Sequence, residues 1–282
     1  MTDNSTPSAV RLPGGHDGLV LDLDGVVYRG RRAVAGAVDA LAALAAARVP
    51  VAYATNNAWR PPQEVAEQLT GLGIPTTADQ VVTSAEIAVD LTTAAVDPGA
   101  SVLVVGGQGL RQAVASRGLR LVSRAADSPA AVVQGFAPDT AWRDLAEASY
   151  AVQNGAVWVA TNTDMTFPSE WGIAPGNGAL VAAVSAATGR LPLVAGKPAP
   201  AMLLAAARRT GARQVLVVGD RLDSDIAGAH AAGLGSALVL TGVSTAEMST
   251  SAPRGQRPSF VADDLLALVE GRWAVLDPEP PT

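Results

Sequence analysis

The sequence contains no cysteine. Disulfides, thiolate nucleophiles and cysteine-ligated zinc are therefore excluded. Histidine is almost as scarce, because only His16 and His230 are present, so a histidine-rich metal centre and a Ser-His-Asp relay are nearly excluded as well. Any metal ion must then be held mainly by oxygen atoms, which are the ligands that Mg²⁺ and similar hard cations prefer.

Lysine is also rare. Of the 20 basic residues, 19 are arginine, and the single lysine is Lys197. Because arginine supplies the positive charge everywhere else, we interpret Lys197 as present for its compact ammonium group, which acts as a point charge rather than a planar fork.

Long basic runs and long apolar runs are missing too. A formal net charge of −6 without a basic run disfavours binding to nucleic acid or to an anionic membrane surface. The N-terminal residues lack the pattern of a signal peptide. The most apolar window, residues 41–54, is interrupted by Arg48 and Pro50 and is too short to span a bilayer. We therefore expect a soluble, cytoplasmic protein that binds neither nucleic acid nor membranes.

The 282 residues suffice for one large or two medium-sized domains. Short Val- and Leu-rich runs alternate with helical patterns, an order typical of parallel sheets with crossover helices. Turn clusters at residues 97–99 and 191–192 divide the chain into three parts. We expect an α/β fold with a doubly wound parallel sheet built from residues 1–97 and 192–282. Residues 98–191 would form a second α/β domain inserted into it.

Two carboxylates stand at the end of the first apolar run. Residues 18–21 lead directly into Asp22 and Asp24, and Gly25 follows. Side chains two residues apart on a strand leave the same face, so the two carboxylates can converge at its carboxyl end, where Gly25 permits a sharp turn. Like charges this close repel unless a cation lies between them. The simpler alternative is a solvated turn in which Asp24 caps the next helix.

Three later elements also end in polar side chains, namely Thr55-Asn56, Lys197, and Asp220 with Asp223 and Asp225. Ligands of open parallel sheets bind outside the carboxyl ends of the strands, so we expect these groups to converge there. Carboxylates, a hydroxyl, an ammonium group and a hard cation together suit phosphoryl transfer, because the cation neutralises phosphate charge while the donors hold its oxygens. Each group taken singly has a structural interpretation, as a helix cap, a strand exit or a turn.

We hypothesise that Asp22 attacks phosphorus and forms an aspartyl-phosphate. Asp24 would protonate the leaving oxygen and later deprotonate the attacking water. Asp220 would bind Mg²⁺ together with a carboxylate oxygen of Asp22 and the backbone carbonyl of Asp24. Asp225 would hold these ligands in place. Whether Asp223 joins the metal site is open.

The phosphoryl oxygens require donors as well as a cation. We expect the Thr55 hydroxyl and the Lys197 ammonium group to bind them. Gly25, Asn56 and Asn57 adjoin these groups and are predicted to contribute to phosphate or substrate binding.

Four motifs in this order resemble those of the haloacid dehalogenase (HAD) superfamily phosphatases. They are DLDGVVYRG (22–30), ATNN (54–57), GKPAP (196–200) and VGDRLDSDI (218–226). The tyrosine and glycine of the first motif, and the long insert between the second and third, resemble subfamily IIA. The resemblance extends over about residues 18–243. It implies a HAD-type, Rossmann-like core, a cap formed by residues from about 98 to 191, and the residue roles given above.

The resemblance also implies a Mg²⁺-dependent phosphomonoester hydrolase that acts on a small phosphorylated metabolite. Glycerol 3-phosphate is the first candidate, and phosphoglycolate, a sugar phosphate and pyridoxal phosphate are the alternatives. Residues 160–168 are similar to a stretch of the family's cap, from which Asn162 and Asp164 are predicted to bind substrate. Such caps commonly dimerise, which implies a homodimer. The chain departs from the family pattern at residues 58–60 (AWR), where many members have small hydroxyl residues before the arginine.

Two other classes fit less well. A phospho-receiver module also uses clustered aspartates, a hydroxyl residue and a lysine, but it lacks a large insert. A dinucleotide-binding loop at residues 105–109 (VGGQG) would need a third glycine where Gln112 stands. We further expect Trp142, Trp158 and Trp171 to lie in the core of the insert and Trp59 to pack on the helix. The alternatives are that Trp171 lines the substrate side and that Trp59 faces the cap.

Overall fold

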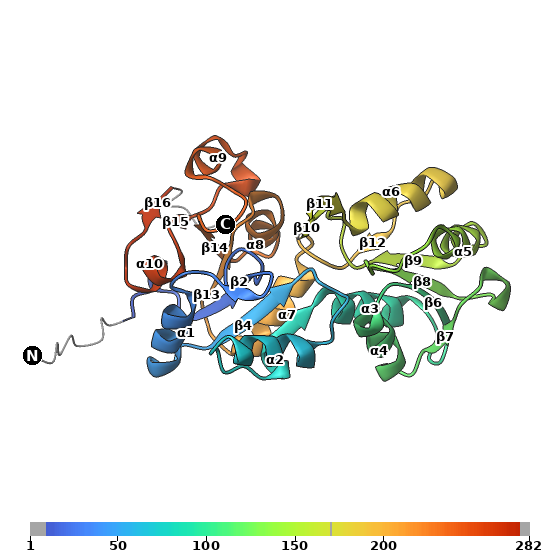
Figure 1. Ribbon diagram of the computed structural model, residues 1–282, viewed down its shortest axis with the longest axis horizontal. Helices are drawn as coiled ribbons and strands as arrows, with labels where there is room; N and C mark the ends of the chain where they lie inside the picture. Colours follow the sequence, from blue (N-terminus) through green and yellow to red (C-terminus); the bar gives the residue numbers. More distant parts are fainter. Residues whose placement is uncertain (1–9, 170, 277–282) are drawn as a thin grey trace, which may run out of the picture. The chain divides into compact units, whose positions relative to one another are not determined.

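The computed structural model describes residues 10–169 and 171–276, without the side chains of residues 167–169. The chain divides into two compact units (Figure 1). Unit 1 consists of the residues up to Thr55, residues 65–82 and the residues from Lys197 onward, and unit 2 consists of residues 56–64 and 83–196. Within the described residues, no helix has the length and apolar character needed to cross a membrane.

Unit 1 is built on a seven-stranded sheet with the strand order β16-β15-β14-β13-β1-β4-β5. Strand β1 is parallel to β13 and β4, β14 is parallel to β13 and β15, and β16 is antiparallel to β15. The strands are β1 (Gly18–Leu21), β4 (Val51–Thr55), β5 (Val81–Thr83), β13 (Val215–Gly219), β14 (Gly235–Val239), β15 (Phe260–Ala262) and β16 (Ala274–Val275). All four residues of β1 are buried, as expected for a central strand covered on both faces.

Helices pack on this sheet through alanine and leucine side chains. Leu44 of α1 and Leu69 of α2 join Leu19 and Leu216 of the strands in one apolar core. In Figure 1, α1 and α10 lie side by side although they come from opposite ends of the chain. The elements outside the sheet are η1 (Pro13–Gly15), α1 (Ala37–Ala46), α2 (Pro62–Gly71), η2 (Ala78–Gln80), α7 (Ala201–Thr210), η4 (Leu222–Ile226), α8 (Ala227–Ala231), α9 (Ala246–Ser251), η5 (Arg254–Gln256) and α10 (Leu265–Val269), with the hairpin β2 (Tyr28–Arg29) and β3 (Arg32–Ala33).

The order of the strands reverses next to β1. The chain runs from β1 to β4 and β5 on one side, and later returns to β13, β14 and β15 on the other side. Asp22 follows β1 directly and Asp220 follows β13 directly. Because ligands of doubly wound sheets bind where the strand order reverses, this edge is where a site is expected.

Unit 2 has its own five-stranded parallel sheet with the order β12-β9-β8-β6-β7. Its strands are β6 (Ser101–Val105), β7 (Arg120–Val122), β8 (Ala131–Gln134), β9 (Val157–Ala160) and β12 (Leu193–Val194), and an antiparallel hairpin is formed by β10 (Thr166–Ser169) and β11 (Gly172–Pro175). The helices are α3 (Ser84–Ala95), α4 (Gln108–Ser116), η3 (Ala125–Asp127), α5 (Trp142–Gln153) and α6 (Asn177–Thr188). An apolar core joins the strands to α5 and α6.

The α/β class with parallel strand pairs in both large sheets is as predicted from the alternating pattern, and the edge strand β16 is antiparallel. The predicted insert comprised residues 98–191, whereas residues 56–64 and 83–196 group together as unit 2 in the structure. Helix α3 belongs to it because α3 packs on α4, β8 and β9. The turn at residues 97–99 therefore lies inside unit 2, whereas the turn at residues 191–192 lies close to its end.

Two local predictions were wrong. Trp142 and Trp171 were expected in a core, but they are 78% and 97% exposed, whereas Trp158 is buried as predicted. Trp142 is the first residue of α5, and Trp171 stands at the turn of the β10–β11 hairpin, so neither position faces the sheet. Residues 246–251 form α9, which Thr245 caps by accepting a hydrogen bond from the backbone N–H of Met248.

Candidate active site

Three carboxylates meet in unit 1 at the point where the strand order reverses. Asp22 follows β1, Asp220 follows β13, and Asp225 lies in η4. One carboxylate oxygen from each lies within 4.8 Å of those of the other two. Asp220 and Asp225 are buried and Asp22 is partly buried, so the cluster sits in a region of reduced solvent screening.

Lys197 supplies the positive charge of this cluster. Its Nζ lies 2.6 Å from Oδ1 of Asp22 and 2.6 Å from Oδ1 of Asp225, and it donates a hydrogen bond to the Ala54 carbonyl at 3.2 Å. The side chain is only 3% exposed. Burial alone would lower the pKa of Lys197, but the charges of Asp22 and Asp225 raise it above its ordinary value. The ammonium group therefore stays charged.

One ammonium group does not balance three carboxylates. Burial raises the pKa of Asp22 well above its ordinary value, and the neighbouring aspartates raise it further against the effect of Lys197. Burial, together with the charge of Asp225, raises the pKa of Asp220 to about 6. Among the described residues, the buried Oδ1 of Asp220 has no hydrogen-bond partner. This all-oxygen set with an unpaired buried acceptor fits a hard divalent cation such as Mg²⁺.

Glycines allow the backbone to close around these carboxylates. Gly25 has a φ of +84°, and a Cβ at this position would lie 2.6 Å from Oδ2 of Asp220. A Cβ on Gly219 would overlap the side chain of Asp225. Backbone N–H groups then bind the carboxylates: Val243 donates to Asp220 at 2.8 Å, and Arg221 donates to Asp225 at 3.1 Å. Gly25 thus forms the turn that the sequence predicted and lies against the Asp220 carboxylate.

Asp24 and Thr55 occupy the same edge of the sheet in different surroundings. Asp24 is exposed in the turn after β1, where its backbone forms an isolated β-bridge with that of Tyr28. Thr55 is buried as the last residue of β4, the strand paired with β1. Leu21 pairs with Tyr53 in this register, so Thr55 is level with the residues that follow β1. A solvated carboxylate suits proton exchange, and a buried hydroxyl suits a fixed hydrogen bond.

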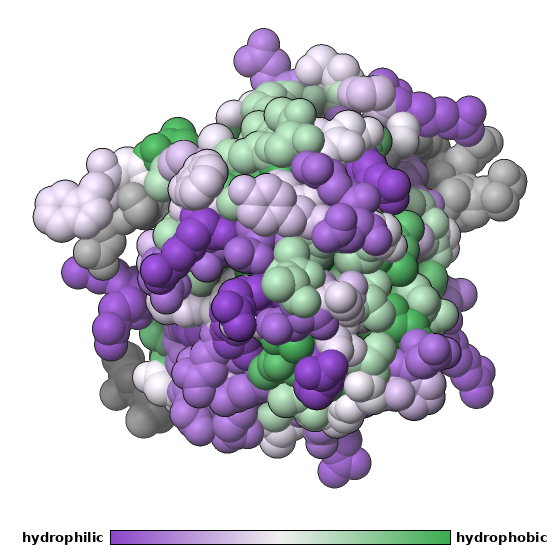
Figure 2. All heavy atoms as spheres, turned by 90° about the vertical axis from the view of Figure 1, so that its right-hand side faces the viewer, coloured by the Kyte–Doolittle hydropathy of each residue, from purple (hydrophilic) through white to green (hydrophobic). Residues whose placement is uncertain are grey.

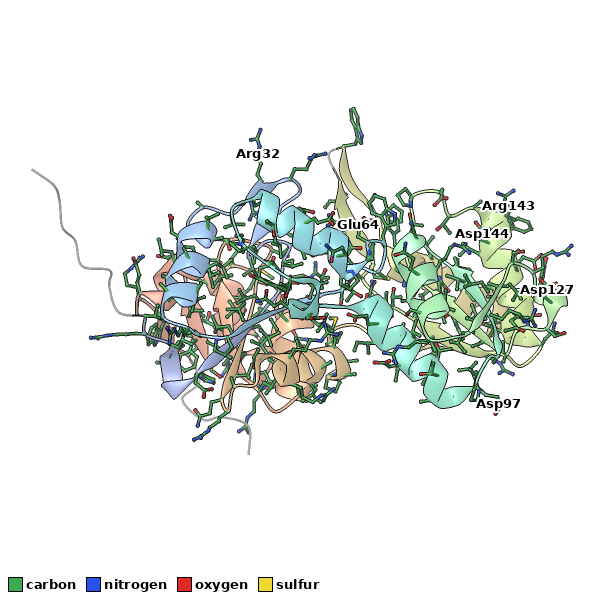
Figure 3. All side chains as sticks on the ribbon, turned by 90° about the horizontal axis from the view of Figure 1, so that it is seen from below. Arg32, Glu64, Asp97, Asp127, Arg143 and Asp144 are labelled. Atoms are coloured by element: carbon green, nitrogen blue, oxygen red, sulfur yellow. The ribbon has the colours of Figure 1, made fainter. Side chains whose placement is uncertain are left out.

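The β2–β3 hairpin, which follows Asp24, is joined to the Asp220 side of the site. The Arg29 guanidinium donates to the Thr241 carbonyl, and the Thr241 hydroxyl donates to the Gly25 carbonyl at 2.6 Å. Arg32 projects from β3 away from the ribbon (Figure 3). These contacts connect the turn after Asp24 to residues 241–243, a segment that the sequence pattern had not linked to the site.

Asp223 lies outside the three-carboxylate cluster. It accepts hydrogen bonds from Nε and Nη2 of Arg221 at 3.1 and 2.8 Å, and its side chain is 62% exposed. The nearby arginine thus pairs with Asp223 at the surface, whereas Asp225 turns inward to Lys197. In the structure Asp223 therefore forms a surface ion pair with Arg221.

The remaining predicted binding residues lie in unit 2 and bond to one another. Nδ2 of Asn56 donates to Oδ2 of Asp164 at 3.0 Å, and Nδ2 of Asn162 donates to the Asn56 carbonyl at 2.8 Å. The backbone N–H of Asp164 donates to Oδ1 of Asn162 at 3.2 Å. Oδ1 of Asn57 accepts from the backbone N–H of Trp59 at 2.8 Å, which closes a local turn. Ser84 also donates to the Asn56 carbonyl at 2.7 Å, and no sequence motif had singled it out.

Residue Trp59 occupies the space beside the glycine-rich loop between β6 and α4. The Trp59 ring lies where a Cβ of Gly107 would be, and the Trp59 carbonyl accepts a hydrogen bond from the N–H of Gly109 at 2.8 Å. A dinucleotide pyrophosphate would need these N–H groups at the helix N-terminus. The glycines therefore allow close backbone approach, and Trp59 packs on α4.

Comparisons with known proteins agree with this geometry. Residues 19–120 match the model of a haloacid dehalogenase-like hydrolase family, and residues 194–268 match a HAD-hydrolase-like family. The chain is 48% identical to D-glycerol 3-phosphate phosphatase of Mycobacterium tuberculosis over 94% of its length and 74% of the relative. It is 37% identical to an acid sugar phosphatase of Staphylococcus saprophyticus over 81% of its length and 88% of the relative.

Solved structures give the same result. The glycerol phosphate phosphatase of M. tuberculosis in complex with magnesium superposes with a TM-score of 0.88 at 48% identity, covering 94% of this chain and 80% of that one. A p-nitrophenyl phosphatase from Archaeoglobus fulgidus superposes with a TM-score of 0.83 at 28% identity, covering 91% and 99%. The chain therefore belongs to the haloacid dehalogenase-like hydrolases and is a phosphatase of that family.

Proposed function

We propose that this protein is a Mg²⁺-dependent phosphomonoester hydrolase whose substrate is a small phosphorylated metabolite, with glycerol 3-phosphate as the first candidate. The observation that carries the proposal is the convergence of Asp22, Asp220, Asp225 and Lys197 at the reversal of the strand order. The substrate is supported by the glycerol 3-phosphate phosphatase that is 48% identical to this chain. Phosphoglycolate, sugar phosphates and pyridoxal phosphate are the alternatives.

A bound Mg²⁺ would be held by carboxylate oxygens of Asp22 and Asp220 and by the backbone carbonyl of Asp24, and it would neutralise negative charge on the phosphoryl group. Asp225 would help to position these ligands without binding Mg²⁺ itself, because its carboxylate is bound by Lys197 and by the backbone N–H of Arg221.

The first half-reaction transfers the phosphoryl group to Asp22. A carboxylate oxygen of Asp22 forms a bond to phosphorus as the bond from phosphorus to the leaving oxygen breaks. Asp24 donates its proton to that leaving oxygen, so an alcohol departs rather than an alkoxide. Lys197 and Thr55 donate hydrogen bonds to the phosphoryl oxygens, where negative charge must be stabilised throughout.

The second half-reaction regenerates the enzyme. Asp24, now a carboxylate, removes a proton from a water molecule that attacks phosphorus. The bond between phosphorus and the Asp22 oxygen breaks, which releases inorganic phosphate and the free Asp22 carboxylate. Lys197 offsets the charge of that carboxylate at both ends of the cycle.

The nucleophile is tested by Asp22→Asn. An amide is a poor nucleophile, so we expect kcat for release of phosphate from 4-nitrophenyl phosphate to fall on the order of 10³-fold or more. Asp223→Asn is the matched control, because Asp223 lies at the surface, and its kcat should stay close to that of the wild type. Near-full activity of Asp22→Asn would refute covalent catalysis by Asp22. Phosphorylation of the wild type without turnover would instead indicate a receiver module.

The substrate is tested by ranking a panel of phosphate esters by kcat/KM. Glycerol 3-phosphate, phosphoglycolate, a sugar phosphate and pyridoxal phosphate are compared at the same Mg²⁺ concentration. Glycerol 3-phosphate is expected to give the highest value. A higher kcat/KM for another ester would reassign the substrate and leave the chemistry unchanged.

We also propose that the protein forms a homodimer through unit 2. Ile173, Leu191 and Leu193 of this unit are 81%, 85% and 51% exposed, and β12, which carries Leu193, is an edge strand. Figure 2 shows apolar side chains set among hydrophilic ones on one face of the molecule. Light scattering should give the mass of a dimer for the wild type and of a monomer for a Leu191→Glu, Leu193→Glu variant. A monomeric wild type would refute the proposal.

A further inference from the structure

We propose that Asn56 is a positioning residue that sets the backbone beside both phosphate-binding donors, Thr55 and Lys197. The inference rests on the proposed function, which assigns these two donors to the phosphoryl group. It also gives Asn162 and Asp164 a different role from the substrate contacts that the family resemblance implied.

The backbone carbonyl of Asn56 is held by two side-chain donors. Ser84 Oγ donates to it at 2.7 Å, and Asn162 Nδ2 donates at 2.8 Å. Ser84 is fully buried and Asn162 is 7% exposed. A carbonyl held by two donors has little freedom to rotate, because each lost hydrogen bond would leave a buried donor side chain unsatisfied. The peptide that follows Asn56 is thereby fixed one residue after Thr55.

The side chain of Asn56 is held as well. Its Nδ2 donates to Oδ2 of Asp164 at 3.0 Å, and the N–H of Asp164 in turn donates to Oδ1 of Asn162. Asn177 donates to the carbonyl of Asn162 at 2.7 Å and braces this loop from α6. Asp164 and Asn162 thus form hydrogen bonds with Asn56 and with each other.

The same side chain packs against the residue before Lys197. A Cβ on Gly196 would lie 2.5 Å from Oδ1 of Asn56 and 2.5 Å from the carbonyl of Thr161. Glycine is therefore required at position 196 for the chain to pass Asn56 this closely. Asn56 follows Thr55 and touches the residue that precedes Lys197, so a single amide group places the backbone next to both donors.

Positioning and direct substrate contact predict different kinetics. Thr55 and Lys197 bind the phosphoryl group, which every ester substrate and inorganic phosphate share. Loss of positioning should therefore weaken all of these ligands alike. A side chain that contacts the organic part of one substrate should instead affect that substrate and leave inorganic phosphate unaffected.

The test compares Ser84→Ala and Gly196→Ala with the wild type. For each protein, kcat/KM is measured with 4-nitrophenyl phosphate and with glycerol 3-phosphate, and Ki is measured for inorganic phosphate as a product inhibitor. We expect kcat/KM for both esters to fall by the same factor, about 10- to 100-fold, and the Ki of phosphate to rise. Ser149→Ala and Gly71→Ala are the matched controls. Ser149 is a buried serine of α5 that donates to a helix carbonyl, and a Cβ on Gly71 would meet no atom within 4 Å.

Two variants of Asp164 test whether a conservative substitution restores activity. Asp164→Asn keeps an acceptor oxygen for Asn56 and is expected to retain most activity, whereas Asp164→Ala should match Ser84→Ala. A large loss in Asp164→Asn, or losses that differ between the two esters while the Ki of phosphate is unchanged, would overturn the inference in favour of substrate contact. Equal losses with an unchanged Ki would indicate only a smaller folded fraction and would also overturn it.

Wild-type activity separates the two proposals. If the wild type hydrolyses neither ester, the proposed function fails. If the wild type is active and all the variants match it, only the positioning role fails. Circular dichroism and thermal melting verify folding, and Ser84→Ala alone decides the matter if Gly196→Ala does not fold.

Discussion

Lys197 lies between two carboxylates in a buried position, with Nζ 2.6 Å from both Asp22 and Asp225. Desolvating three charged groups is costly, and this arrangement persists because each charge faces an opposite one. Removing one partner therefore destabilises the fold more than replacing the whole group of charges with apolar residues would, because it leaves an uncompensated buried charge. The only lysine of the chain was singled out from composition, and its two partners explain why an ammonium group rather than a guanidinium fits.

Lys197→Met is expected to lower the free energy of unfolding of the metal-free protein by about 3–5 kcal/mol, because it leaves buried carboxylates without a counter-charge. Urea denaturation in the presence of EDTA measures this change. The double variant Lys197→Met, Asp22→Asn should regain part of the loss, since one of the uncompensated charges is then gone. Simple addition of the two single effects would contradict this interpretation.

At the scale of elements, glycines at the N-terminus of α4 allow residues 59–60 to pack closely against the helix. A Cβ on Gly109 would lie 2.7 Å from the backbone carbon of Arg60 and 2.8 Å from the Trp59 carbonyl. The sequence pattern left a dinucleotide loop open as an alternative, because periodicity carries no information about which distant segment covers a helix end.

Gly109→Ala is expected to destabilise the protein by about 1–3 kcal/mol through overpacking against residues 59–60. Gly71→Ala, at the last position of α2 with open space around it, should be neutral or slightly stabilising. Urea denaturation of both variants measures the difference. Equal stability of the two variants would show that the contact at Gly109 relaxes without cost.

The same covering of α4 predicts that NAD does not bind there. Thermal melting with and without NAD should give the same Tm. A rise in Tm that Gly107→Ala abolishes would show that the covering residues can be displaced.

At the scale of the whole molecule, the three-carboxylate cluster proposed to hold the cation joins segments that lie far apart in the sequence. Asp22 comes from near the N-terminus, and Asp220 and Asp225 come from the last third of the sequence. A ligand that binds only the folded arrangement stabilises all of it, by RT ln(1 + [L]/Kd).

Mg²⁺ at 100 times its Kd is therefore expected to add about 2.7 kcal/mol to the free energy of unfolding and to raise Tm. Asp220→Asn should abolish this rise, because it removes the carboxylate with the unpaired Oδ1. Asp223→Asn should keep it, since Asp223 pairs with Arg221 at the surface. Thermal melting in Mg²⁺ and in EDTA compares the three proteins, and a full Mg²⁺ response in Asp220→Asn would refute the assigned cation site.

The sequence by itself determined the strands that end in Asp22, Thr55 and Asp220, because a buried strand shows as a short Val- and Leu-rich run and its last residues lie at one edge of the sheet. It also determined that metal ligands must be mainly oxygen atoms, and it singled out Lys197, because both inferences follow from which residue types are missing or rare. These inferences depend only on local pattern and composition.

Tertiary structure alone decided which polar atoms face one another. Asp225 rather than Asp223 turns to Lys197, α3 joins unit 2, and Asn56 bonds to Asp164, 108 residues away. A hydrogen bond between residues so far apart depends on the packing of several elements at once. No window of sequence contains that information, so contacts of this kind emerge only when the chain has folded.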